Sequence, residues 1–306
     1  MWAPRSLVAV TGLLLSTLLL PAAGGSLGRP HLDQFQRPLT NESVTSSRAV
    51  GDLMGDQQAA YGSVGVNEMP VWTVPAGQAL VRVSVAAGCN DFTADTGAAV
   101  PIPAAASTTG TGDSPLVIDQ PSTQTDWELW RAVRRDGAWS ACWGGRLNTA
   151  TSDGVFPSPF GMSASGISYL ATVITEADVK SGSIDHAIAL DLPGCTRPEI
   201  PPAVRNDCGA DPGQPPYGTW FRFPAALPVP RGLTPFGRMV FEAVRTYGMV
   251  LVDQAGAVML QAEDTRDWVA EGRTGTDPIT VSWDGEQEYQ VVAALPWRQL
   301  EVIDRP

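Results

Sequence analysis

Apolar and polar residues alternate in short runs from Val71 onward, and turns rich in Gly, Pro and Asp separate these runs. Alternation with a period of two is typical of β-strands that bury one face. The predicted strands are ALVRVSV, PLVIDQ, TDWELWRAV, AWSACWGGRL, GTWFRFP, ITVSWD and EYQVVAAL. The Asp136-Gly137 pair indicates a hairpin turn, and GMVLVDQAGAVMLQAED predicts a second hairpin that turns at Asp253–Gly256.

Two segments carry helix signals instead. TEADVKSG begins at Thr175, with Asp178 three residues later as a weak capping box, and it ends at a glycine. TPFGRMVFEAVRTYG begins at Thr234 with a proline in the first turn, and it ends at Gly248. Its apolar stripe consists of Phe236, Met239, Val240, Ala243, Val244 and Tyr247. We therefore expect a mainly β protein, a two-sheet jelly-roll-like sandwich with one or two short helices.

The N-terminus has the pattern of a secretory signal. Arg5 precedes the uncharged apolar run Leu7–Leu20, and small residues follow, which predicts a signal peptide at residues 1–24. The run is short for a membrane span, which needs about 20 apolar residues, so a retained anchor is the less favoured alternative. Residues 25–70 are polar and without a strong period, and we expect an arm there, followed by a single β-sandwich domain at residues 71–306.

All four cysteines lie in the expected mature chain, at Cys89, Cys142, Cys195 and Cys208. An even number in an exported chain indicates two disulfides, for which three connectivities exist. We favour Cys195–Cys208, which closes a proline-rich loop, together with Cys89–Cys142. No pair has the C-x-x-C spacing of a zinc site, and we predict no metal and no cofactor.

The formal net charge of −12 narrows the choice of partners. A strongly acidic surface repels nucleic acid and anionic membranes, and we expect neither as a partner of the mature protein. The same charge opposes strongly anionic polysaccharides unless a local basic patch binds them. The sequence does not indicate an oligomeric state.

His186 is one of only two histidines, and the other, His31, follows the signal. The alternation of Ile184–Leu192 places His186 on an apolar face. It is either a hydrogen-bonded core residue or a general base or substrate donor at the bottom of a cleft. One usable histidine excludes metal sites built on two or three histidines, and the chain from Val71 onward lacks the G-x-S-x-G, Walker and dinucleotide motifs.

Carboxylates beside aromatic rings are the stronger chemical signal. TDWELWRA places Asp126, Glu128 and Trp130 on one strand face, and the partner strand contributes Trp139 and Trp143. Rings of sugars stack on indoles, their hydroxyls bond to carboxylates, and paired carboxylates hydrolyse glycosides. Alternatively, Asp126 and Glu128 face solvent while the tryptophans fill the core. Further candidates are Asp119, Glu263 and Asp264 at strand ends, and Arg222, for which we expect a structural ion pair.

Seven segments fit a known family pattern: VWTVPAGQALVRV, VPIPAAA, PSTQTDWELWRA, WSACWGGRL, SASGISYLATVITEADVKSGSIDHAIALDLP, GTWFRFP and AVRTYGMVLVDQAGAVMLQAED. In this order they resemble a widespread, uncharacterised family of secreted bacterial proteins with W/Y-E-F-W-Q/R-A, G-x-I-D/N-H-A-L and R-Y-G-I/M-V-V-x-D motifs. The resemblance extends over roughly Pro70 to Ile303 and implies secretion and one β-rich domain, but no reaction. The matching positions include Glu128, Trp130, Gly166, Asp185, His186, Arg222, Tyr247, Gly248, Asp253, Glu263 and Asp264.

Two departures from the family pattern bear on activity. Many relatives carry a histidine where this chain has Pro115, and their W-P-A-x-R loop is here EIPPAVRNDC, bracketed by cysteines. If the missing histidine works with His186 in the relatives, this chain has lost that activity or does not need it.

Three hypotheses remain open. The first is a secreted protein that binds a polysaccharide in a groove lined by Trp130, Glu128 and their neighbours. The second is a polysaccharide-cleaving enzyme. A hydrolase would use two of Asp126, Glu128, Asp119, Glu263 and Asp264, and a lyase would use His186, Tyr247 and Arg222. The third is a structural or adhesion protein of the cell envelope, which has no open cleft.

Overall fold

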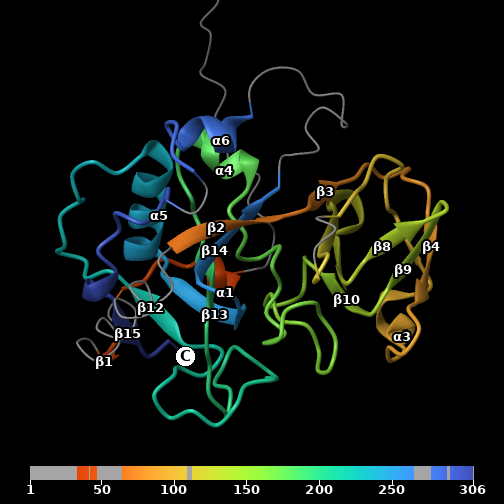
Figure 1. Cartoon of the computed structure of the whole chain (residues 1–306), viewed down its shortest axis with the longest axis horizontal. Helices are drawn as coiled ribbons and strands as arrows, with labels where there is room; N and C mark the ends of the chain where they lie inside the picture. Colours follow the sequence, from red (N-terminus) through yellow and green to blue (C-terminus); the bar gives the residue numbers. More distant parts are fainter. Residues whose placement is uncertain are drawn as a thin grey trace, which may run out of the picture.

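The computed structural model describes residues 33–40, 42–46, 64–108, 112–264, 277–287 and 290–305. The expected signal peptide at residues 1–24 lies outside these ranges. The described chain is mainly β, as predicted, and its strands form one seven-stranded sheet and two four-stranded sheets. Figure 1 shows the large sheet and its helices on one side of the molecule and the two smaller sheets on the other.

The large sheet is mixed. Its order is β1-β15-β12-β13-β11-β14-β2, with bounds β1 (Val44–Ser46), β2 (Val64–Met69), β11 (Ile188–Leu192), β12 (Trp220–Arg222), β13 (Met249–Gln254), β14 (Val258–Glu263) and β15 (Glu301–Ile303). β11 runs parallel to β13, and β14 runs parallel to β2. A jelly roll is built from antiparallel strands, so that detail of the expectation is not confirmed.

The two smaller sheets pack on each other as a sandwich. One contains β3 (Val71–Thr73), β6 (Leu116–Gln120), β7 (Thr125–Trp130) and β10 (Trp143–Asn148); the other contains β4 (Val81–Val85), β5 (Ala99–Val100), β8 (Val133–Arg135) and β9 (Ala138–Ala141). Their shared core includes Ile118, Leu129 and Trp139. The predicted Asp136-Gly137 turn joins β8 to β9 and has φ of 51° and 82°, as a tight hairpin turn requires.

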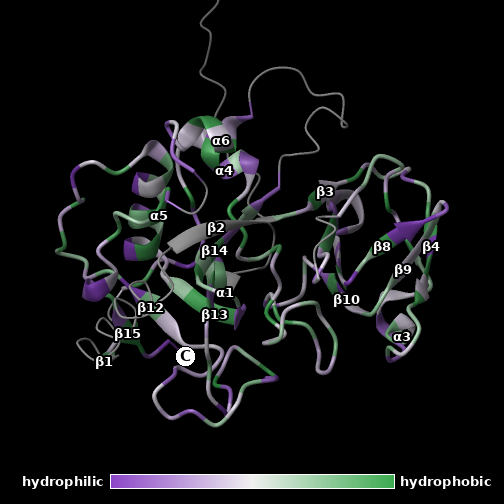
Figure 2. Cartoon of the chain, viewed as in Figure 1, coloured by the Kyte–Doolittle hydropathy of each residue, from purple (hydrophilic) through white to green (hydrophobic). Residues whose placement is uncertain are grey.

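Both predicted helices form. Thr175 and Asp178 make the reciprocal capping box of α4 (Glu176–Ser181). Thr234 caps α5 (Pro235–Thr246), which packs its apolar stripe against the large sheet and stacks Phe241 on Phe223 with ring centres 5.1 Å apart. Figure 2 shows hydrophobic and hydrophilic residues side by side on α5. Shorter helical segments are α1 (Asp33–Gln36), α3 (Thr93–Thr96), α6 (Pro278–Ser282), η1 (Pro121–Thr123) and η3 (Trp297–Gln299).

Two predicted strands near the C-terminus are wrong. ITVSWD lies mostly in α6, because Asp277 accepts a hydrogen bond from the backbone N–H of Ile279 and Pro278 occupies the first turn. The described part of EYQVVAAL forms turns from Gln290 onward. Val292 is nevertheless fully buried, so these apolar residues fill the core without joining a sheet.

The predicted hairpin at Asp253–Gly256 is also wrong. β13 and β14 are not paired with each other, because β11 lies between them and pairs with both. All five residues of β11 are buried, as expected of a central strand. The connection after β13 therefore arches across the end of β11. The predicted strand at Ile184–Leu192 is shortened accordingly, and His186 precedes it.

The expected polar arm at residues 25–70 joins the core wherever it is described. β1 and β2 are edge strands of the large sheet, and Phe35 is fully buried against Trp220. Arg305 closes the same region, since its guanidinium donates to the carbonyl oxygens of Arg37 at 2.7 Å and Tyr247 at 3.0 Å. The expected single domain at residues 71–306 contains two separate hydrophobic cores rather than one.

Both favoured disulfides are present. Cys89–Cys142 lies in the small sandwich, and Cys195–Cys208 closes the proline-rich loop. Two structural disulfides indicate an oxidising compartment, either extracellular or periplasmic. Among the described residues, no helix has the length and apolar character needed to cross a membrane.

Candidate functional site

A cavity of about 850 Å³ opens where the large sheet meets the small sandwich. Its lining includes Met69, Asp113, Pro115, Trp130, Trp143, Met162, Ala164, Tyr169, Asp191, Arg205, Asn206, Asp207, Asp253 and Gln254, together with 255–257 and Met259. The arch between β13 and β14 thus forms part of one wall. Cavities of this size hold small organic ligands or a few sugar units.

Two aspartates of the large sheet line the cavity. Asp191 of β11 and Asp253 of β13 are register partners near the carboxyl ends of neighbouring parallel strands. A bulge between Leu190 and Asp191 brings them into register. In open sheets with parallel strands, ligands bind in the crevice outside the carboxyl ends of those strands.

The two carboxyl groups have different surroundings. Asp253 accepts hydrogen bonds from the backbone N–H of Ala164 at 2.9 Å, from its neighbour Gln254 at 2.8 Å and from the Tyr169 hydroxyl at 3.2 Å. Burial raises the pKa of Asp253 to about 6, against the lowering effect of these donors. Asp191 is 3% exposed; its Oδ2 accepts from the Gln261 amide, and its Oδ1 has no hydrogen-bond partner among the described residues.

Burial raises the pKa of Asp191 well above its ordinary value, and the nearby negative charge of Asp253 adds to the rise. Burial disfavours the ionised form, and a second carboxylate disfavours it further. Asp191 therefore holds a proton under conditions where Asp253, with three donors, has lost its own. Paired carboxyl groups with such divergent environments are a common basis for acid–base chemistry.

Two tryptophans also line the cavity and are held in place by their own contacts. The indole N–H of Trp130 donates to Asp113 at 3.1 Å, and the Arg131 guanidinium lies 4.4 Å from the ring centre. Trp143 stacks on Phe160 with ring centres 5.7 Å apart, and its N–H donates to a backbone carbonyl at 3.1 Å. Rings fixed in advance lose little freedom when a ligand binds.

The loop closed by Cys195–Cys208 also contributes to the cavity lining. The Arg205 guanidinium donates to the carbonyl oxygens of Pro159, Gly161 and Ser163, which fixes the neighbouring loop. The Tyr217 hydroxyl donates to Asp207 at 2.9 Å. The cysteine-bracketed segment therefore positions side chains at the cavity.

The predicted catalytic residue Glu128 lies outside the described cavity lining. Glu128 and Asp126 share one strand face, as predicted, but both are fully buried against the segment that carries Ser168 rather than exposed. Ser168 Oγ lies 3.1 Å from Asp126 Oδ2 and 2.9 Å from Glu128 Oε1. One hydroxyl hydrogen cannot serve two carboxylates fully, so the arrangement favours a protonated carboxyl. Burial raises the pKa of Glu128 to about 7.

This burial predicts a pH-dependent stability. The folded-state pKa of Glu128 exceeds its unfolded value, so the protonated form favours folding and stability falls as pH rises from about 4.5 to 7. We expect Glu128→Gln to reduce this loss by up to about 3 kcal/mol. Urea unfolding at several pH values measures it, with the exposed Glu286→Gln as control. If the free energy of unfolding falls with pH equally in Glu128→Gln and in the wild type, Glu128 does not cause the pH dependence of stability.

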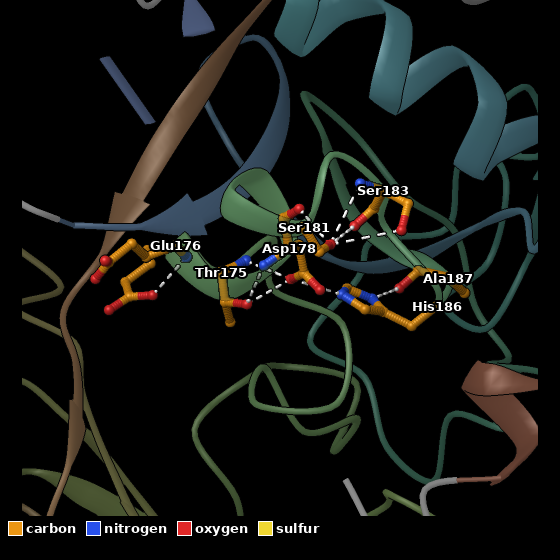
Figure 3. Close-up of polar contacts among 8 residues, drawn as sticks. Thr175, Glu176, Asp178, Ser181, Ser183, His186 and Ala187 are labelled. Atoms are coloured by element: carbon orange, nitrogen blue, oxygen red, sulfur yellow. Dashed lines mark hydrogen bonds and ion pairs between the residues drawn. The ribbon is translucent and has the colours of Figure 1, made fainter. Parts of the chain in front are cut away.

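His186 is a buried structural residue in this fold. Its Nδ1 lies 2.8 Å from the Ala187 carbonyl oxygen and its Nε2 lies 3.2 Å from Asp178 Oδ2 (Figure 3). Both partners are oxygen acceptors, to which a ring N–H can donate. Asp178 also accepts from the backbone N–H of Thr175 at 2.7 Å. The histidine thus fastens the cap of α4 to the segment before β11.

We expect His186→Gln to lower the free energy of unfolding by about 1–3 kcal/mol, because it breaks a buried charge-assisted hydrogen bond. Chemical denaturation measures this loss, with the exposed neighbour Asp185→Asn as control. An unchanged stability would show that the link between α4 and β11 contributes nothing.

The remaining predicted residues lie elsewhere in the described structure. Arg222 pairs with Glu301 at 3.0 Å, the structural ion pair that we expected. Asp119 is half-buried on β6, Tyr247 is half-buried at the end of α5, and Glu263 accepts from a backbone N–H at 2.8 Å. None of these lines the described part of the cavity, so they do not assemble the hydrolase or lyase sites that we had considered.

Of the predicted site residues, Trp130 lines the cavity, and Trp143 joins it there from the predicted partner strand. Sequence reasoning missed Asp191 as a candidate and named Asp253 only through the family pattern. A signal was present, because each aspartate directly follows an apolar run, AIAL and MVLV. Such runs predict buried strands, and a carboxylate at the end of a buried parallel strand is placed for ligand contact.

Neither the potential metal ligands nor the comparisons with known proteins assign a function to this site. Among the described residues, one group of potential ligands lies close together, Cys195, Asp207 and Cys208, and its two sulfurs are bonded to each other. It therefore lacks the thiolates that bind zinc. Comparison with protein-family models, with curated proteins and with solved structures gives no match. The resemblance drawn from the sequence motifs stays a prediction, and function must be argued from the cavity.

Proposed function

We propose that this is a secreted carbohydrate-binding protein that holds a neutral or amino-sugar oligosaccharide in the cavity. The observation that carries the proposal is that two fixed tryptophans and two buried or half-buried carboxyl groups line the same cavity. Flat aromatic rings cover the C–H face of a sugar, and carboxyl oxygens accept hydrogen bonds from its hydroxyls.

The charge of the cavity selects the class of sugar. Its lining contains four aspartates, Asp113, Asp191, Asp207 and Asp253, against one described cation, Arg205. A negative cleft attracts cations and repels anions. The cavity therefore favours neutral sugars and protonated amino sugars over uronates, in agreement with the overall charge of −12.

The expected location outside the cell and the presence of an open cavity support the same proposal. An N-terminal signal pattern together with two disulfides suits a protein that meets polysaccharide outside the cell. A purely structural envelope protein predicts no open cleft, and the cavity of about 850 Å³ counts against that alternative.

The test is binding to a panel of chitosan, chitin, xylan, mannan, β-1,3-glucan and starch, with pectin and alginate as anionic members. We expect Trp130→Ala and Trp143→Ala each to weaken binding of the preferred glycan about 10- to 100-fold, the cost of removing a central aromatic anchor. Trp130→Phe keeps the flat face and retains most affinity. Isothermal titration on variants with unchanged melting temperature measures the effect.

Leu80→Ala is the control, because Leu80 is 67% exposed and lies in a separate, smaller depression beside Trp127 and Arg146. If Leu80→Ala weakens binding while both tryptophan variants bind normally, the site is the smaller depression and the proposal is wrong. Binding of no member of the panel would also overturn it.

A further inference from the structure

We infer that the cavity cleaves the glycan it holds, with Asp191 as the proton donor and Asp253 as the nucleophile of a glycoside hydrolase. This rests on the proposed function, because the two carboxyl groups act only on a sugar bound between them and the tryptophans. The catalytic pair is therefore not among the sequence candidates, which the fold buries or disperses, but among the residues that line the cavity.

Asp191 has the features expected of a general acid. The residue lines the cavity but is 97% buried, and its Oδ1, which is itself shielded from solvent, makes no hydrogen bond within the described residues. A buried polar atom without a partner costs free energy. A protonated Oδ1 has a hydrogen to give, and the oxygen of a glycosidic bond is the acceptor that the proposed ligand brings.

Asp253 has the features of the ionised partner. Two backbone N–H groups and the Tyr169 hydroxyl donate to its oxygens and favour the carboxylate. The two carboxyl groups therefore differ in hydrogen bonding as well as in burial. An acid that keeps its proton beside a carboxylate that has lost its own is the arrangement that glycoside hydrolysis requires.

The strand register favours a double displacement. Asp191 and Asp253 are paired residues of neighbouring strands, whose backbones lie about 4.8 Å apart, so the two side chains start from adjacent positions. Retaining glycosidases hold their carboxyl groups about 5–5.5 Å apart, whereas inverting enzymes need more room for a water molecule. We therefore expect the anomeric configuration to be retained.

The reaction then proceeds in two balanced steps. In the first, Asp191 gives its proton to the glycosidic oxygen, the bond from C1 to that oxygen breaks, and a carboxylate oxygen of Asp253 bonds to C1. In the second, a water molecule gives a proton to the Asp191 carboxylate. The oxygen of that water bonds to C1, and the ester bond between C1 and Asp253 breaks. One water molecule is consumed for each bond cleaved, and both carboxyl groups return to their starting states.

The experiment measures binding and new reducing ends on the same samples of mature, disulfide-bonded protein, with the polysaccharide panel above. We expect the wild type to release reducing ends from the polymer that it binds. Asp191→Asn and Asp253→Asn should each lower the rate of hydrolysis at least 100-fold, because loss of a general acid alone costs about 100- to 10,000-fold. The affinity for the polysaccharide should change less than tenfold. Asp136→Asn is the matched control, because this exposed aspartate lies in the β8–β9 turn at φ 51°, which asparagine also adopts.

Azide separates the two roles. Asp253→Asn should regain turnover in azide and yield a glycosyl azide, since azide replaces the lost nucleophile, whereas Asp191→Asn yields no such product from a natural glycan. Binding without release of reducing ends by the wild type overturns the hydrolase and leaves the binding function intact. Absence of binding overturns both, and hydrolysis that survives both substitutions overturns the assignment to this pair.

Discussion

Gly218→Ala is expected to lower the free energy of unfolding by more than about 3 kcal/mol, or to prevent folding. Gly218 has φ of +87°, and an added Cβ would lie 1.8 Å from the Ile200 carbonyl oxygen. The obstructing atoms are backbone and cannot rotate away. Overpacking alone costs about 1–3 kcal/mol or more, and the left-handed backbone adds about 1–2 kcal/mol for a residue with a Cβ.

Urea unfolding, or the soluble yield if the variant does not fold, measures this effect. Gly232→Ala is a matched control, because Gly232 has φ of +81° but no atom within 4 Å of the added Cβ. It carries the backbone strain without the collision, so we expect a loss of only about 1–2 kcal/mol. Equal losses for the two variants would show that the close approach to Ile200 is not what requires glycine.

The site depends on this glycine. The Gly218 N–H donates to the Leu251 carbonyl oxygen at 3.0 Å, which holds the segment against β13. The adjacent Tyr217 anchors Asp207 and accepts a hydrogen bond from the backbone N–H of Ile200 at 2.9 Å. Gly218 thus lets the cysteine-bracketed loop close on the large sheet, and that loop carries Arg205 to the cavity wall.

Removing the Cys89–Cys142 disulfide by a double Cys→Ser substitution is expected to cost about 4 kcal/mol. The bond joins residues 53 positions apart, and the chain-entropy model gives about this value for a loop of that length. Most domains are stable by only about 5–15 kcal/mol, so the small sandwich should unfold at much lower denaturant. The disulfide links the connection between β4 and α3, which contains Cys89, to Cys142 between β9 and β10.

The Cys195–Cys208 pair provides the comparison. These residues are 13 positions apart, and the same model predicts a loss of about 3 kcal/mol on replacing both by serine. Chemical denaturation of the two double variants, monitored by tryptophan fluorescence, gives both values. A larger loss for the shorter loop would mean that contacts in the folded loop, rather than chain entropy, determine its contribution.

Local signals in the sequence predicted local structure well. Caps placed α4 and α5, a two-residue turn placed the β8–β9 hairpin, and loop composition favoured the observed disulfides. These features depend on residues a few positions apart or on covalent bonds. α6 shows the limit, because Asp277 and Pro278 signal a helix start directly before a segment that we predicted as a strand.

The candidate site was not predictable in the same way, because it depends on which strands become neighbours. The apolar run before Asp253 predicted a strand but not its parallel pairing with β11, which places Asp191 beside it. Strand periodicity correctly placed Asp126 and Glu128 on one face. It could not show that this face packs on Ser168, about forty residues along the chain, instead of facing solvent or ligand.

A crystal structure of Asp191→Asn with an oligosaccharide of the glycan that the protein binds tests the central claim most directly. The account predicts sugar rings against Trp130 and Trp143, with a glycosidic oxygen beside residue 191 and C1 facing Asp253. A sugar bound instead in the depression lined by Leu80, Trp127 and Arg146, with the larger cavity empty of sugar, would contradict it.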